Sequence, residues 1–247
     1  MSWPVNAQIE QSEHRERHYA EHEPQSLDVE HTHRLQASQN PYSHGMARVL
    51  LTGFEPFADA PANSSWDAVE LLAETWSRSD DLVIRRIPVV FGSGGRRLVE
   101  HVAAHTPDVV VAVGVAEGRS AVTPERVAIN LRDARIPDNA GRQPVDVPSV
   151  AGGPAAYFST LPVSRIVEAV RAAGIAAEPS VTAGTYVCND AFYTLQHSLV
   201  GLGVASGFIH VPASVSMELG PDVPTMPIGL IARALGIAIE TALEERT

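Results

Sequence analysis

Short apolar segments alternate with amphipathic segments from Arg48 onward, and this alternation limits the possible folds more than any other feature of the chain. The run 108–113 is almost wholly aliphatic, which is typical of a strand buried on both faces of a parallel sheet. Strands alternating with helices predict an α/β fold with a doubly wound, mostly parallel sheet, and 247 residues are enough for one such domain. We predict further strands at 48–51, 82–90 and 204–211, one approached at Val181, and helices at 65–76, 92–105, 162–173, after Cys188, and at 227–244.

Helix caps and loops follow from the same pattern. Ser64 or Ser65 should cap the helix at 65–76, and Asn189 or Asp190 the helix after Cys188. Residues 114–160 are rich in Gly, Pro, Asp and Asn, and we expect irregular structure there apart from a short apolar piece at 127–131. A loop region this long is more often functional than idle, and ligands of doubly wound sheets bind beyond the carboxyl ends of the strands.

The first 45 residues differ in composition from the rest. They contain six of the ten histidines, few aliphatic residues and no apolar period, so we expect a mobile extension followed by a folded domain at 46–247. The histidines could form a metal-binding tail, but we favour a solvated extension, or a translated leader before a true start at Met46. They are His14, His18, His22, His31, His33 and His44.

Charge and cysteine content exclude several classes of protein. With 18 basic and 29 acidic residues the formal net charge is −11, which argues against a nucleic-acid partner. The longest strongly apolar run, 109–116, is far shorter than the roughly 20 residues that cross a membrane. A single cysteine excludes an intramolecular disulfide and a thiolate zinc cluster, and the first residues show no secretory signal. We therefore expect a cytoplasmic protein.

Cys188 stands at a predicted strand-to-helix junction, where the helix dipole favours the thiolate. By position alone, the interpretation to prefer is a buried structural cysteine, which is common for this residue type. His210 ends the predicted strand at 204–211, so both side chains can meet at one rim of the sheet. The three other histidines outside the extension, which are expected on helices, are interpreted as structural: His101, His105 and His197.

Glu125 precedes the apolar piece that should enter the interior. An unpaired buried carboxylate is costly, so Glu125 needs a partner, and the neighbouring Arg126 is one candidate. The other is His210, because a nucleophile, a proton acceptor and a carboxylate that fixes the imidazole are the parts needed for acyl transfer.

Four segments in order resemble the type I pyroglutamyl peptidases, also called pyrrolidone-carboxylate peptidases, across residues 46–245. They are 50–57 with Asn63 and 65–66, 123–130 with 133–139, 183–189, and 207–212. The resemblance implies an α/β/α sandwich, a thiol mechanism without metal or cofactor, and a homo-oligomer, frequently a tetramer. It implies peptides with N-terminal pyroglutamate as substrates and places the catalytic residues at Glu125, Cys188 and His210. It also implies a pocket for the pyrrolidone ring formed by Phe54, Phe57, Asn63, Ile136, Tyr186 and Val187, in which aromatic walls suit a flat lactam.

Several positions depart from the family pattern. The family's usual Gln before the catalytic Glu is replaced by Val115, with Glu117 following, so that ligand contact cannot be assigned here. Asp190 follows the Cys188-Asn189 pair, and an acidic group there would raise the pKa of the thiol. Bulkier residues would also be expected at Ala213 and Ser214.

Two other functions are compatible with an α/β sheet. A nucleoside phosphorylase or nucleosidase would need a glycine-rich phosphate loop, for which the cluster at 91–96 is the candidate, although a turn leading into a helix explains it more simply. A catalytically silent protein that binds peptide N-termini would retain the pocket alone.

Overall fold

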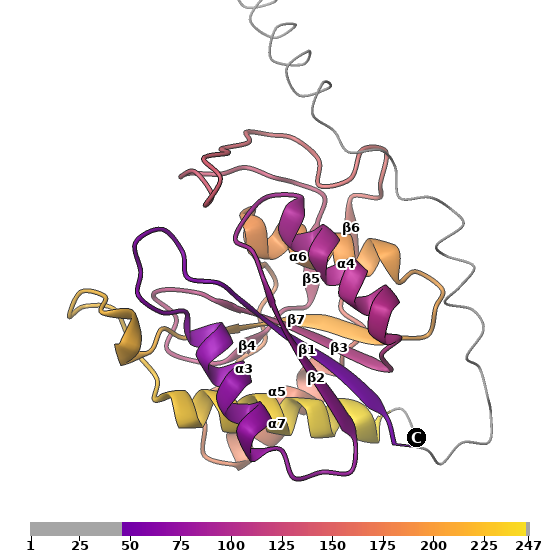
Figure 1. Cartoon of the computed structure of the whole chain (residues 1–247), viewed down its shortest axis with the longest axis vertical. Coiled ribbons are helices and arrows are strands. Elements are labelled where there is room, and N and C mark those ends of the chain that lie inside the picture. Colours follow the sequence, from indigo (N-terminus) through magenta and orange to yellow (C-terminus); the bar gives the residue numbers. More distant parts are fainter. Residues whose placement is uncertain (1–45, 246–247) are drawn as a thin grey trace, which may run out of the picture. The chain divides into compact units, whose positions relative to one another are not determined.

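The computed structural model describes residues 46–245. Its main sheet has the order β2-β1-β3-β7-β4. The strands β1 (Arg48–Phe54), β2 (Asp81–Ile87), β3 (Val109–Val115) and β7 (Ala205–Val211) run parallel, and the edge strand β4 (Thr123–Pro124) runs antiparallel to β7 (Figure 1). The predicted doubly wound, mostly parallel sheet is thus confirmed. The extension expected at 1–45 lies outside the described residues.

Helices cover both faces of this sheet. On one face lie α3 (Ser64–Thr75), α5 (Val163–Ala172) and α7 (Ile228–Glu244), and on the other lie α4 (Ser93–His105) and α6 (Val187–Ser198) (Figure 1). Each face has its own apolar core, one built around Leu51, Val111 and Leu235 and the other around Leu50, Val110 and Phe208. Alternate residues of the same strands therefore serve opposite cores, as the twofold repeat of a strand requires. The three layers confirm the α/β/α sandwich.

The long loop region contains more structure than its composition predicts. β5 (Val127–Ile129) pairs antiparallel with β6 (Ala156–Phe158) to form a separate two-stranded sheet. The predicted apolar piece at 127–131 thus includes a strand. Asn189 of α6 fastens this strand, because its side chain both accepts from the Ile129 N–H at 3.0 Å and donates to the Ile129 carbonyl at 2.9 Å.

Two local predictions are wrong. No strand precedes α6: residues 181–186 are irregular, and the preceding Ser180 makes only an isolated bridge with Glu125. The helix caps also differ, because α3 is capped by Asn63 and α6 begins at Val187, before Asn189 and Asp190. Side chains predicted as caps are instead drawn into tertiary contacts, which outweigh local preference.

Between residues 46 and 245 there is no helix with the length and apolar character needed to span a bilayer. Over the same range, His, Cys, Asp and Glu side chains form no group of three or more that could hold a metal ion.

Candidate active site

His210 lies near the carboxyl end of β7, between two strands. The sheet register pairs it with Gly114 of β3 on one side and with Thr123 of β4 on the other. Only 4% of the residue is exposed, and its ring lies 4.9 Å from that of Phe208 between centroids. The position of this imidazole is thus fixed by the sheet itself.

Glu125 follows β4 and is fully buried. Its backbone N–H donates to the carbonyl of Phe208 at 2.9 Å, which brings its side chain to the rim where His210 lies. The His210 Nδ1 is 2.7 Å from Glu125 Oε1. A carboxylate can only accept, so the imidazole donates from Nδ1, and its Nε2 is left as the acceptor of the neutral ring. The predicted pairing of Glu125 with His210 is present.

Opposing effects act on the pKa values of this pair. Burial by itself would raise the pKa of Glu125, but the hydrogen bond and charge of His210, with Arg119, lower it overall. Burial lowers the pKa of His210, and Arg119 adds to this, so that together they outweigh the raising effect of Glu125. Near neutral pH the pair is therefore a carboxylate beside a neutral imidazole.

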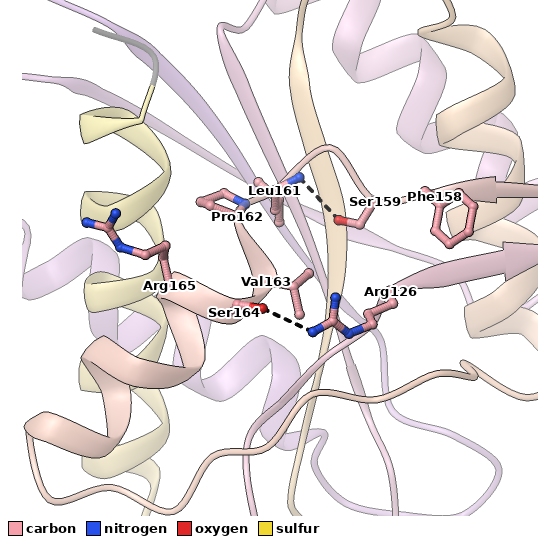
Figure 2. Close-up of a pocket in the computed structure, with 8 residues that line it drawn as sticks. All are labelled: Arg126, Phe158, Ser159, Leu161, Pro162, Val163, Ser164 and Arg165. Carbon is pink, nitrogen blue, oxygen red and sulfur yellow. Dashed lines mark hydrogen bonds between the residues drawn. The ribbon is translucent and has the colours of Figure 1, made fainter.

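The cationic partner of Glu125 is Arg119, a residue that the sequence did not suggest. Its Nη1 donates to Glu125 Oε1 at 2.7 Å. Arg126, the candidate from the sequence, donates instead to the hydroxyl of Ser164 at 3.0 Å, and Figure 2 shows its guanidinium turned toward that residue. Neighbours along an extended chain point to opposite sides, so adjacent residues are poorly placed to pair.

Cys188 is the second residue of α6 and is partly exposed. Its sulfur lies against the backbone of β3, because a methyl group built on Gly114 would be 2.9 Å from Sγ. Gly114 is the sheet neighbour of His210, so the structure brings the thiol and the imidazole to the same point of the rim. Within residues 46–245 no hydrogen bond joins the two groups directly; such contacts often tighten only when substrate binds.

The surroundings of Cys188 oppose the thiolate that the helix dipole is expected to favour. Burial raises the pKa of Cys188 to about 12, the charge of Glu125 adds to this, and Arg119 opposes it. Asp190 is not the cause, because its carboxylate pairs with Arg132 Nε at 2.6 Å and accepts from the Gly92 N–H at 2.7 Å. Desolvation thus outweighs the helix dipole at this position.

An aromatic cluster lies beside the start of α6. Tyr186 meets Phe57 and Phe91 edge to face, with ring centroids 5.9 Å and 5.1 Å apart. The Tyr186 hydroxyl donates to the carbonyl of Pro137 at 2.7 Å, which fixes the ring against the loop that contains Ile136. Ile136 is 50% exposed and therefore available to a ligand. Phe91, the third ring, was not predicted; an aromatic residue next to the glycine cluster was its only signal.

The remaining predicted pocket residues are more deeply buried. Phe54 and Val187 both approach Gly94 of α4, at 3.7 Å and 3.6 Å from a methyl group built there, so they lie together beneath that helix. Asn63 accepts from Ser65 N–H at 3.0 Å and donates to the Glu55 carbonyl at 2.9 Å. The structure thus places Asn63 as a helix cap whose acceptor oxygen is occupied.

The glycine cluster at 91–96 serves packing. Gly92 has φ +70° and its N–H is taken by the Asp190 carboxylate, where a phosphate would have to bind. A methyl group on Gly95 would lie 2.7 Å from Thr194, so this glycine allows α4 and α6 to approach closely. This segment is therefore the turn into a helix rather than a phosphate loop.

Two surface hollows lie away from Cys188 and flank Phe158. One, of about 250 Å³, lies beside Arg126 and the start of α5 (Figure 2), and the other, of about 340 Å³, lies beside the end of α6. Phe158 itself is 76% exposed between them.

Known sequences similar to this chain agree on one family. A profile of the family described as pyroglutamyl peptidase matches residues 47–245. A pyrrolidone-carboxylate peptidase of Pseudomonas fluorescens is 50% identical over 198 residues, covering 80% of this chain and 93% of the relative. One of Clavibacter michiganensis is 47% identical over 203 residues, covering 82% and 95%.

Solved structures lead to the same family. The crystal structure of pyroglutamyl peptidase I from Bacillus amyloliquefaciens matches with a TM-score of 0.77 and 43% identity, covering 81% of this chain and 98% of that one. A mutant pyrrolidone carboxyl peptidase of Pyrococcus furiosus matches with a TM-score of 0.76 and 40% identity, covering 80% and 99%.

Proposed function

The chain belongs to the pyroglutamyl peptidase family, and we propose that Cys188, His210 and Glu125 perform its chemistry as nucleophile, base and orienting carboxylate. The protein is a cysteine peptidase that removes N-terminal pyroglutamate from peptides. Neither a nucleosidase nor a catalytically silent binding protein is favoured. The observation that best supports the three roles is the 2.7 Å bond between Glu125 and His210, with the Cys188 sulfur against the strand position next to that histidine.

The reaction begins from neutral partners. His210 Nε2 takes the proton of the Cys188 thiol as the sulfur attacks the pyroglutamyl carbonyl, and the resulting imidazolium is stabilised by Glu125. His210 then gives this proton to the departing amine as the C–N bond breaks, which leaves a thioester. Water, activated by the same imidazole, cleaves the thioester and releases pyroglutamate.

The start of α6 can stabilise the oxyanion. Its first helical bond runs from the Asp190 N–H to the Tyr186 carbonyl at 3.1 Å, and earlier N–H groups of a helix have no acceptor within it. Those groups lie around the nucleophile, where the positive end of the helix dipole also favours negative charge.

In this proposal the aromatic cluster binds the pyrrolidone ring of the substrate. Phe57 and Tyr186 form a wall that accepts a neutral lactam, with Ile136 exposed beside it and Phe54 and Val187 beneath. Asn63 contributes by fixing the loop at Glu55 through its cap bonds. A prolyl ring carries a charged nitrogen, and removing its hydration in such a pocket is costly without a counter-charge.

The test is a comparison of two fluorogenic substrates. We expect kcat/KM for prolyl-aminomethylcoumarin to be at least about 10³-fold below that for the pyroglutamyl compound, because sites that bond a polar substrate group reject analogues lacking it. Release of base from inosine should not be detected. Equal kcat/KM values for the two aminomethylcoumarins would contradict the pocket assignment, and no turnover of either would contradict the function.

We propose residues 46–247 as the catalytic domain, which the family match to 47–245 supports. A chain lacking residues 1–45 should keep its turnover and melting temperature. A halved rate would show that the extension belongs to the working enzyme.

A cytoplasmic location and a homo-oligomer, with a tetramer as the expected size, complete the proposal. The exposed Phe158 between two hollows supports self-association, since an apolar side chain of this kind is commonly covered in an assembly. Light scattering on the purified protein should give a mass above 26.4 kDa, and Phe158→Ser should lower it. Cell fractionation tests the location.

A further inference from the structure

Arg119 connects three segments around the active site. It follows β3, and its Nη1 donates to the Thr123 hydroxyl of β4 at 2.6 Å as well as to Glu125 Oε1 at 2.7 Å. Its Nη2 donates to the carbonyl of Thr182, in the segment that leads to Cys188, at 3.1 Å. The Arg119 side chain is 28% exposed, whereas the Glu125 side chain to which it bonds is fully buried.

Glu125 is a buried carboxylate, and Arg119 is the cation that balances its negative charge. The hydrogen bonds from Arg119 and His210 to this carboxylate end on the same oxygen, Oε1. If His210 were the only group paired with a buried anion, the anion would favour a protonated imidazole. An imidazolium cannot accept the proton of the Cys188 thiol. Burial is the main cause that lowers the pKa of His210, and a cation that shares the charge of the carboxylate without being consumed in the reaction adds to this effect.

We propose that Arg119 is a positioning residue of this peptidase, which fixes Glu125 Oε1 and balances its charge so that His210 stays neutral with Nε2 free to accept the thiol proton. This inference rests on the proposed roles of Glu125, His210 and Cys188. In this proposal Arg119 acts through Glu125, to which it is bonded, and not on the substrate.

The electrostatics of the site agree with this role. The titratable and charged groups that act on one another here are His210 from β7, Cys188 from α6, Glu125 after β4 and Arg119 after β3, with the hydroxyl of Ser180 beside Glu125. Arg119 lowers the pKa of the carboxyl, the imidazole and the thiol alike. Its removal should raise all three, so His210 would become protonated at a higher pH than in the wild type.

The first experiment compares pH profiles of kcat/KM on pyroglutamyl-aminomethylcoumarin for the wild type and three variants. Arg119→Met should lower kcat/KM by about 10- to 100-fold, the usual cost of losing a hydrogen bond to a charged group. The acid limb of its pH profile should move up by about one pH unit. Arg119→Lys keeps the positive charge, so the acid limb of its pH profile should stay near the wild-type position. Arg126→Met, the matched control from the neighbouring arginine that bonds Ser164, should leave the profile unchanged.

A second measurement does not depend on turnover. Cys188 is the only cysteine, so carbamidomethylation by iodoacetamide reports on one thiol. At a fixed pH its rate should fall in Arg119→Met and recover in Arg119→Lys. In Arg119→Ala, millimolar guanidinium should restore part of both the labelling rate and kcat/KM, whereas tetramethylammonium at the same concentration should not.

The outcomes test the role of Arg119 separately from the proposed function of the protein. A lower rate in Arg119→Met with an unshifted acid limb, unchanged labelling and no guanidinium rescue would overturn the proposal and leave Arg119 with a packing role. Melting temperatures identify a variant that fails to fold, and Arg119→Lys then decides the question. If the wild type fails to cleave the pyroglutamyl substrate, the proposed function is wrong, while the labelling rates still test whether Arg119 controls the thiol.

Discussion

Replacing Gly114 by alanine is expected to displace the nucleophile. The new methyl group would lie 2.9 Å from Cys188 Sγ and 2.8 Å from Phe208 Cζ, whereas ordinary van der Waals contact begins at 3.4 Å. To relieve this overlap, a neighbouring atom must move by about 0.5 Å, which is as large a displacement as a catalytic site tolerates. Phe208 is fully buried, so the partly exposed Cys188 side chain will move more readily.

The expected magnitudes follow from two effects. Overpacking a close-packed core costs about 1–3 kcal/mol of unfolding free energy. Misplacement of a reacting atom by about 1 Å can cost on the order of 10²-fold in rate, so about 0.5 Å should reduce kcat/KM some 10- to 100-fold. The rate loss should persist after correction for any unfolded fraction.

The assay pairs urea unfolding with turnover of pyroglutamyl-aminomethylcoumarin. Gly207→Ala is the matched control, because the methyl group added to this strand would come closest to the Ser159 hydroxyl and lie 2.7 Å from Leu161, away from Cys188. That variant should lose stability but keep most of its kcat. Gly220→Ala, for which no atom lies within 4 Å, should change neither quantity. If Gly114→Ala retained full activity, the sulfur could not lie where the structure places it.

Three further predictions concern single side chains. Cys188→Ser should abolish turnover with the fold intact, and one iodoacetamide label per chain should inactivate the wild type; full activity after complete labelling would contradict a thiol mechanism. Glu125→Gln should reduce kcat by about 10²- to 10⁴-fold. The pKa of Glu125 is lowered in the folded state, so its carboxylate stabilises the fold above the ordinary pKa of 4.5, and this stabilisation is lost as the pH falls through the folded pKa. The difference in unfolding free energy between the wild type and Glu125→Gln, measured with urea, should therefore shrink in acid. Asn63→Ala should cost about 1 kcal/mol of unfolding free energy through its lost cap, and an unchanged urea midpoint would argue against that role.

The sequence predicted the long elements well because each has a strong period or a clear terminator. The helices expected at 162–173 and 227–244 are observed as Val163–Ala172 and Ile228–Glu244, each directly after a proline. The strand expected at 181 was wrong because a few β-branched residues do not reveal whether a backbone has a pairing partner. Val181 is 71% exposed, and the sheet edge there is occupied by β4 instead.

The three proposed catalytic residues were identifiable from the sequence because His210 lies at the end of a strand, Cys188 at the start of a helix and Glu125 just before an apolar segment. Their pKa values could not be predicted from the sequence, because the pKa of a thiol depends on how deeply the tertiary structure buries it. Arg119 was missed for a similar reason. A buried carboxylate indicates the need for a cation, but Arg119 precedes Glu125 by six positions, and only the fold shows that its side chain reaches back to the carboxylate.

The geometry of the site depends on the contact between a sheet and a helix. His210 cannot shift along β7 without breaking its register with both Gly114 and Thr123, so the imidazole belongs to the sheet. Cys188 belongs to α6, whose distance from the sheet is set by the absence of a side chain at Gly114. The separation of nucleophile and base is therefore controlled by one backbone position. Substitutions that change how α6 packs should accordingly alter kcat more than substitutions of equal energetic cost on the opposite face, where α3, α5 and α7 pack.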